Sequence, residues 1–190
     1  MASPSAEALE SIFGSSVINA AGEEIPVEEL AKCDAIGVYF SAHWCPPCRG
    51  FTPMLIGTYK KLKDSDKRFE VIFVSLDRSE ADFKTYFAGM PWTSVRFMDS
   101  ARRDQLNNRF TPSGIPALYI VDNEGVMLQE NGRQAVVADP EGKNFPWVAF
   151  KLSFAERVSS QLMPRLMQLL PLLFILYSLV RFVARYLGYL

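Results

Sequence analysis

The sequence predicts an α/β fold in which helices flank a central mixed β-sheet, and three observations carry this prediction. Two nearly continuous apolar runs, 35–42 and 69–76, have the length and composition of strands covered on both faces. Each run is followed by a segment whose apolar residues recur at helical spacing. A third run, 117–122, passes through the tight turn 123–125 into an apolar partner, 126–129. Strand–helix–strand–helix order followed by a hairpin is typical of a mixed sheet.

The first half of the chain contains two further local signals. Residues 15–30 read as two short strands around a turn at Gly22, and Pro26 suits an edge strand because it has no N–H to donate. Residues 51–64 carry apolar side chains at helical spacing, so we expect a helix directly after a pair of cysteines.

Three segments complete the predicted order of elements. The segment 78–90 reads as a helix, with Ser79 and Asp82 resembling a capping pair at its start. Residues 100–110 read as a short helix, and residues 138–147 read as a loop. We find no internal repeat.

Composition and charge exclude some function classes. The chain has 190 residues, of which 49 % are hydrophobic, enough for a well-buried core. Its formal net charge of −1 gives no reason to expect a nucleic-acid partner. The first ten residues lack the basic and apolar regions of a secretory signal, so we expect none. Three cysteines are too few, and odd in number, for a secreted disulfide framework.

The stretch SAHWCPPCRG, residues 41–50, holds two of these cysteines in a CxxC pattern that permits redox chemistry, metal binding or a structural staple. A metal site needs two further ligands, and only Cys33 and His43 are candidates, so no metal is expected. An exposed four-residue disulfide is readily reduced, which disfavours a staple. We therefore expect redox chemistry, and we interpret Cys33 as a plain small residue at a strand start.

The position between a strand and a helix explains how the pair would react. Helix N-termini favour anions, and CxxC thiols reach pKa values of about 3.5 to 7.5. Cys45 is thus the expected nucleophile, and Cys48, one helical turn later, the thiol that resolves the mixed disulfide. Pro46 and Pro47 suit the first helical positions, and Trp44 offers an apolar platform for a partner.

Four motifs in order, FSAHWCPPCRGFTP, VSLDRSEADFKTYFAGMPW, GIPALYIVD and DPEGKNFPW, resemble those of tryparedoxins, in the nucleoredoxin-like branch of the thioredoxin superfamily. The resemblance spans about residues 17–147 and implies a thioredoxin-like fold. It implies electron flow from trypanothione, as the reducing co-substrate and with no bound cofactor, to protein clients. The implied clients are 2-Cys peroxiredoxins, glutathione-peroxidase-type peroxidases and ribonucleotide reductase.

The resemblance also assigns roles to residues. Cys45 matches the attacking cysteine and Cys48 the resolving one. The rest of the active-site signature is matched by Trp44, Pro46, Pro47 and Arg49. Tyr39 and Asp77 match the family's tyrosine and acid behind the cysteines. Ile115 and Pro116 match the loop that faces the disulfide, in which the proline is cis. Arg133 matches a basic residue that meets the carboxylates of trypanothione.

Some residues depart from the family pattern or have simpler interpretations. His43 replaces the usual serine, and Arg78 stands where the family often has an acid that meets the polyamine of trypanothione. Asp77 could be a solvated acid at a strand end, and Arg133 a plain surface charge. A dithiol with another reductant, or a non-catalytic redox adaptor on a membrane, therefore stays open as an alternative function.

The predicted organisation is an N-terminal segment (1–15), a thioredoxin-like domain (16–156) and a hydrophobic tail (157–190). Residues 166–180 carry no charge, and no acidic residue follows Glu156. Fifteen helical residues span roughly 22 Å, short for a bilayer, but basic and aromatic flanks can extend the span. A buried helix and an interfacial helix are the alternatives. We expect a membrane anchor, with the domain facing the cytosol from the mitochondrial outer membrane.

Overall fold

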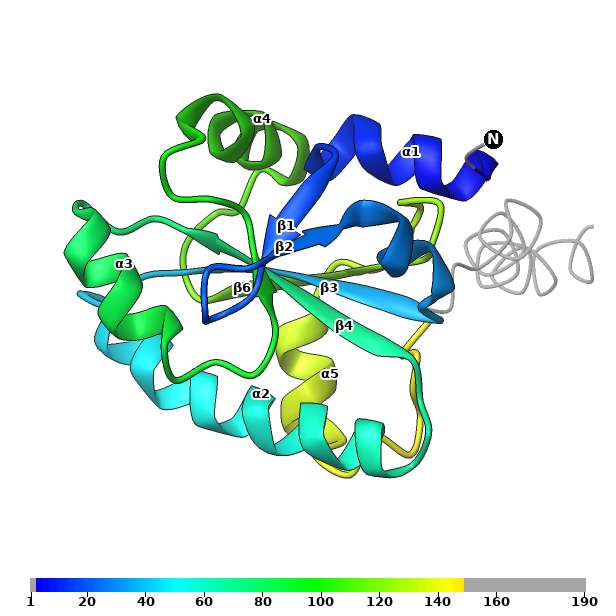
Figure 1. Cartoon of the computed structure of the whole chain (residues 1–190). Coiled ribbons are helices and arrows are strands. Elements are labelled where there is room, and N and C mark those ends of the chain that lie inside the picture. Colours follow the sequence, from blue (N-terminus) through cyan, green and yellow to red (C-terminus); the bar gives the residue numbers. More distant parts are fainter. Residues whose placement is uncertain (1–2, 149–190) are drawn as a thin grey trace, which may run out of the picture. The chain divides into compact units, whose positions relative to one another are not determined.

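The computed structural model describes residues 3–148 (Figure 1). A seven-stranded mixed sheet has the order β2-β1-β5-β4-β3-β6-β7. Its strands are β1 (Ser16–Ile18), β2 (Glu24–Pro26), β3 (Ala35–Ser41), β4 (Phe69–Ser75), β5 (Thr93–Ser94), β6 (Ala117–Val121) and β7 (Met127–Gln129). The helices are α1 (Pro4–Phe13), the 3₁₀ helix η1 (Val27–Lys32), α2 (Pro46–Asp64), α3 (Glu80–Phe87), α4 (Ser100–Phe110) and α5 (Gly132–Ala138).

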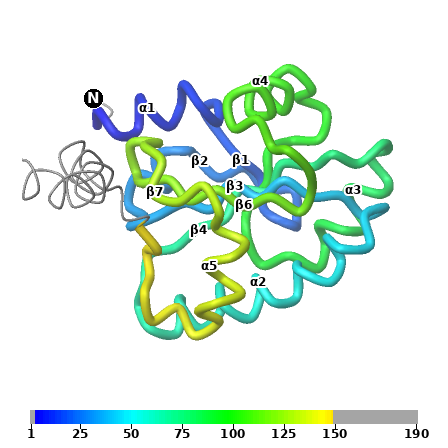
Figure 2. The backbone as a smooth tube through the Cα atoms, turned by 180° about the vertical axis from the view of Figure 1, so that it is seen from behind, coloured from blue at the N-terminus to red at the C-terminus, as the bar shows by residue number. Residues whose placement is uncertain are grey.

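Helices cover both faces of the sheet. Helices α2, α3 and α5 pack on one face, and α1 and α4 lie on the other, as the views from the front and from behind agree (Figures 1 and 2). Strand β3 serves both layers because its side chains alternate: Tyr39 belongs to the first core cluster, whereas Val38 and Phe40 belong to the second. The continuous apolar pattern of β3 is thus explained by its central, doubly covered position.

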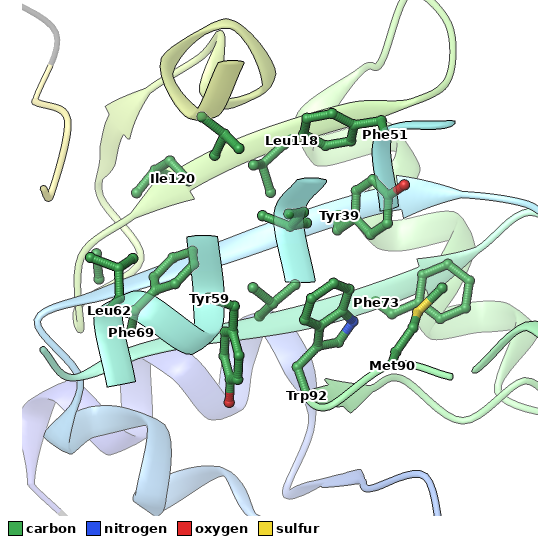
Figure 3. Packing of buried hydrophobic residues seen from close by; sticks show 14 of the residues in the cluster. Tyr39, Phe51, Tyr59, Leu62, Phe69, Phe73, Met90, Trp92, Leu118 and Ile120 are labelled. Atoms are coloured by element: carbon green, nitrogen blue, oxygen red, sulfur yellow. The ribbon is translucent and has the colours of Figure 1, made fainter. Parts of the chain in front are cut away.

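Aromatic residues fill much of the core beneath α2. The rings of Tyr39 and Tyr59 meet Trp92 edge to face, with centroids 6.2 Å and 5.6 Å away (Figure 3). Tyr39 is fully buried, and its hydroxyl points away from Trp92 toward the end of the sheet where α2 begins (Figure 3). Edge-to-face pairs of this kind add about 0.5–1.5 kcal/mol each beyond the burial of their surface.

The sheet topology brings three loops to one edge. Strands β3 and β4 are parallel and in register from Ala35↔Phe69 to Ser41↔Ser75, so both end at the same edge. Strand β6 runs antiparallel to β3 and starts there, with Ala117 opposite Phe40. The segments that follow Ser41 and Ser75 and the segment that precedes Ala117 are therefore neighbours.

Most predicted elements are confirmed, with small shifts at their ends. The helix expected over 78–90 is shorter in the structure, where α3 covers Glu80–Phe87. Ser79 caps it, because the Ser79 Oγ accepts the Asp82 N–H at 3.1 Å. Pro26 lies on the edge strand β2, as expected. Helices α1 and α5 and the two-residue strand β5 were not predicted from the sequence, and residues 27–30, which were read as strand, belong to η1.

The predicted membrane anchor, residues 157–190, does not fall within residues 3–148. Within this range, none of the helices combines the length and apolarity that crossing a bilayer requires. The predicted anchor and the predicted domain boundary at 156 lie outside the described residues.

Candidate active site

The two predicted cysteines lie at the start of α2 and form a disulfide. Cys45 is the N-cap residue, with extended backbone (φ −94°, ψ 108°), and its sulfur accepts the Cys48 N–H at 3.3 Å. Pro46 and Pro47 take the first two helical positions, where a missing N–H costs nothing. The first turn of α2 contains no acidic residue, so no carboxylate in that turn opposes the effect of the helix dipole on the sulfur.

The disulfide is shielded and not exposed as we expected from the sequence: Cys45 is 4 % exposed and Cys48 is fully buried. Across from it lies the loop before β6, in which the Ile115–Pro116 peptide bond is cis, as the resemblance implied. The Sγ of Cys45 lies 3.7 Å from the carbonyl oxygen of Ile115. This contact joins segments 70 residues apart and shows that the predicted loop does face the disulfide.

Asp77 is buried and does not behave as a solvated acid. It is 6 % exposed, and its carboxylate accepts the His43 backbone N–H at 2.7 Å and the Ser75 hydroxyl at 2.8 Å. The acid therefore holds the turn that leads into the cysteines.

Trp44, directly before Cys45 in the chain, has an exposed side chain. The residue is 49 % exposed, and its indole N–H donates to the Leu76 carbonyl at 3.1 Å. The guanidinium of Arg78 lies 5.2 Å from the ring centroid, within cation–π range. The position where the family resemblance led us to expect an acid thus presents a cation beside the tryptophan.

Two cavities flank this edge of the sheet. The larger, about 320 Å³, brings Ile115 and Pro116 together with exposed Arg133, and Glu130 also lines it. The smaller, about 240 Å³, is lined by His43 and exposed Arg49 among others. Arg133 therefore shares a cavity with the cis-proline loop, while Arg49 lies on the other cavity.

Tyr39 lies behind the dithiol, and burial raises the pKa of its phenol well above the ordinary value. Its hydroxyl reaches Thr52 of α2 at 2.8 Å, a contact that the sequence analysis did not anticipate. Thr52, Tyr86 and Ser41 all join this polar cluster. The only hint in the sequence is that Thr52 follows Cys48 by four residues, on the same helical face.

Cys33 is separate from this site and lies at the end of η1. Burial, followed by the negative charge of Glu70, raises the pKa of its thiol to about 11. A thiol that stays protonated is a poor nucleophile, which agrees with the interpretation of Cys33 as a plain small residue.

Residues 34–127 match the family model described as thioredoxin-like. Human nucleoredoxin is 49 % identical over 112 residues, covering 59 % of this chain and 26 % of that protein. This chain thus spans about a quarter of the length of the nucleoredoxins that it matches. Tryparedoxin of Trypanosoma brucei brucei is 41 % identical over 111 residues, covering 58 % of this chain and 76 % of that protein.

Solved structures agree with this relationship. Tryparedoxin II from C. fasciculata superposes with a TM-score of 0.70 at 40 % identity, covering 75 % of this chain and 99 % of that structure. Tryparedoxin I from Crithidia fasciculata gives a TM-score of 0.69 at 41 % identity, covering 77 % and 99 %. The fold, the disulfide at the start of α2 and these relatives together show that the chain belongs to the thioredoxin-like family of oxidoreductases, with tryparedoxins and nucleoredoxins as its relatives.

Proposed function

We propose that this chain reduces protein disulfides through the Cys45–Cys48 dithiol. The observation that carries the proposal is the position of Cys45: it caps α2, and its sulfur faces the Ile115 carbonyl at 3.7 Å. A helix N-terminus stabilises a thiolate, which is the reactive form of cysteine. A cavity of about 320 Å³ opens on the Ile115–Pro116 loop, whose Ile115 carbonyl faces the sulfur, and it offers room for the chain of a substrate.

The exchange proceeds in two displacements. The Cys45 thiolate attacks one sulfur of the substrate disulfide, so that a mixed disulfide forms and the other substrate sulfur leaves as a thiolate. Cys48 then loses its proton to solvent and attacks the Cys45 sulfur, which releases the second substrate thiolate. The substrate gains two electrons, and the Cys45–Cys48 disulfide is the oxidised product that a reducing dithiol must regenerate.

Trypanothione is the reductant that we propose, with no bound cofactor. The identity to tryparedoxins supports it, and one tryparedoxin II structure, 39 % identical, contains glutathionylspermidine. Exposed Arg133, on the cavity beside Ile115, is suited to meet a carboxylate of such a thiol. The proposed clients are 2-Cys peroxiredoxins, glutathione-peroxidase-type peroxidases and ribonucleotide reductase.

A second candidate is the same chemistry with another reductant. The observation that favours it is Arg78, whose cation lies over Trp44, where the ammonium groups of a polyamine would be repelled. The identity of 49 % to human nucleoredoxin, against 41 % to the tryparedoxin, points the same way.

The experiment that tests the proposal couples the full-length chain to a peroxidase and compares trypanothione, glutathione and dithiothreitol as electron donors. We expect Cys45→Ser to abolish turnover, and Cys48→Ser to accumulate a mixed disulfide whose partner mass spectrometry identifies. Full turnover by Cys45→Ser would contradict the proposal that this chain is a disulfide reductase. A non-catalytic redox adaptor would then describe it better. Turnover with dithiothreitol but not with trypanothione would select the second candidate.

We also propose that residues 166–180 attach the protein to a membrane, with the domain facing the cytosol. The absence of charge in this run and the flanking arginines support a short span, which suits the mitochondrial outer membrane. The full-length protein should stay in the pellet after alkaline carbonate extraction. Its release into the supernatant would contradict a spanning segment, and truncation after Glu156 should abolish membrane attachment.

A further inference from the structure

Three hydrogen bonds meet at the side chain of Thr52 on α2, behind the dithiol. Its Oγ1 lies 2.9 Å from the Cys48 carbonyl oxygen, 2.8 Å from the Tyr39 hydroxyl and 2.6 Å from the Tyr86 hydroxyl. The Tyr86 hydroxyl also lies 3.1 Å from the Ser41 Oγ. One side chain on the active-site helix is thus joined to β3 through Tyr39 and to α3 through Tyr86.

The chemistry of these groups fixes the direction of every hydrogen bond. The Cys48 carbonyl has no proton, so Thr52 must donate its only proton to it. Both tyrosines must then donate to the two lone pairs of Thr52, and Ser41 must donate to Tyr86. Burial raises the pKa of Tyr39, which keeps its phenol protonated and able to donate. The network therefore has a single orientation, and it ends at the backbone of Cys48.

Helix α2 has a particular need for support at this point. Pro53 lies inside the helix and has no N–H to donate to the Arg49 carbonyl, four residues earlier. The first turn, which carries both cysteines, is therefore held to the rest of α2 by fewer backbone hydrogen bonds than an ordinary helical turn. Thr52, next to the proline and only 6 % exposed, donates one side-chain hydrogen bond to this turn, at the Cys48 carbonyl.

We propose that Thr52 is a positioning residue for the resolving cysteine. Through the Cys48 carbonyl, the hydroxyl network keeps the Cys48 sulfur in line with the Cys45 sulfur for the second displacement. Cys45 is held differently, by the hydrogen bond from its N–H to the Ala42 carbonyl at 3.2 Å. Loss of the network should therefore slow resolution and spare the first attack. The inference rests on the proposed dithiol chemistry but not on the identity of the reductant or client.

The test separates the two displacements in the full-length protein. The reduced chain, in a Cys33→Ser background that removes the third thiol, is mixed in a stopped-flow instrument with an equimolar aromatic disulfide, DTNB. Attack by Cys45 releases one coloured thiolate, and attack by Cys48 on the mixed disulfide releases the second. We expect Thr52→Val to slow the second phase about tenfold and to change the first less than about twofold, because a small misplacement of a reacting group is enough. Thr52→Ser keeps the hydroxyl and should restore the second phase.

Thr58→Val is the matched control on the same helix. Thr58 is 1 % exposed and donates one hydrogen bond to the Pro140 carbonyl at 3.1 Å, but it makes no hydrogen bond to the dithiol turn. This variant should lose stability yet keep both phases. Tyr86→Phe removes one donor to Thr52 and should slow the second phase alone, which gives a result even where Thr52→Val folds poorly.

The outcomes distinguish the inference from the proposed function. An unchanged second phase in Thr52→Val, equal slowing of both phases, or failure of Thr52→Ser to restore the rate would overturn the positioning role while leaving the reductase intact. A wild-type chain that releases no second thiolate would contradict the dithiol chemistry itself, and the positioning role with it.

Discussion

The backbone N–H of His43 donates to the carboxylate of Asp77 at 2.7 Å, across 34 residues of sequence. The other carboxylate oxygen accepts the Ser75 hydroxyl at 2.8 Å. A buried acid at the end of β4 thereby holds the turn from which Trp44 projects beside the disulfide. Asp77 therefore supports the site by fixing this turn, and its carboxylate makes no hydrogen bond to either sulfur.

We predict that Asp77→Ala destabilises the protein by about 1–3 kcal/mol, because one buried and one partly buried donor lose their acceptor. Chemical denaturation of the full-length chain measures this loss. Asp77→Asn keeps one oxygen for the His43 N–H and should cost less. Equal stabilities of the alanine variant and the wild type would show that the turn does not depend on this carboxylate.

Arg78→Glu should change the choice of reductant. Replacing the cation over Trp44 with an acid removes repulsion and adds attraction for a polyamine, and exposed ion pairs contribute about 0.2–1 kcal/mol, or up to about fivefold in kcat/KM. The measurement is kcat/KM for trypanothione, with uncharged dithiothreitol as the control donor. Parallel changes for both donors would argue against an electrostatic role of this position.

Gly132 opens α5 directly before Arg133, and a side chain there has no room. A Cβ at Gly132 would lie 2.8 Å from the Leu118 carbonyl oxygen, which belongs to the backbone of β6 and cannot move aside cheaply. Gly132→Ala should therefore destabilise the fold by about 1–3 kcal/mol and weaken binding at the adjoining cavity.

Gly57→Ala is the control for this prediction. Apart from its chain neighbours and the backbone of its own helix, no heavy atom lies within 4 Å of a Cβ built at Gly57, which sits inside α2. The change should be neutral or stabilising by up to about 1 kcal/mol, because alanine loses less backbone entropy in a helix. Thermal unfolding of the two variants measures the difference. A Gly132→Ala variant more stable than Gly57→Ala would show that a Cβ at Gly132 is tolerated.

Cys33 should make stability fall at alkaline pH. Its thiol has a pKa raised from 9.0 to about 11 in the folded protein, so the folded state binds the proton more tightly than the unfolded state. The resulting stabilisation is fully present below pH 9 and is lost as pH rises toward 11. Cys33→Ala should flatten the decline of the unfolding free energy over this window. An identical slope in both proteins would mean that the thiol does not titrate differently on folding.

The sequence predicted the elements whose signals are local. Buried strands such as β3 and β4 show as apolar runs, and Ser79 marks the start of α3 through its own side chain. Strand β5, with two residues, and α5, with seven, are too short for a periodic pattern. Both elements are stabilised by packing against neighbouring elements, and a short stretch of sequence does not reveal such packing.

The sequence by itself determined the redox-active pair, because the CxxC spacing, the prolines and the order of strand and helix are all contained in adjacent residues. The flanking motifs also located Tyr39, Asp77 and the cis-proline loop. Only the tertiary structure decided what these residues contact. Asp77 holds the His43 turn, and Thr52 collects hydroxyl groups from β3 and α3. Such partners are set by strand register and by helices crossing a sheet, and these relations join positions tens of residues apart.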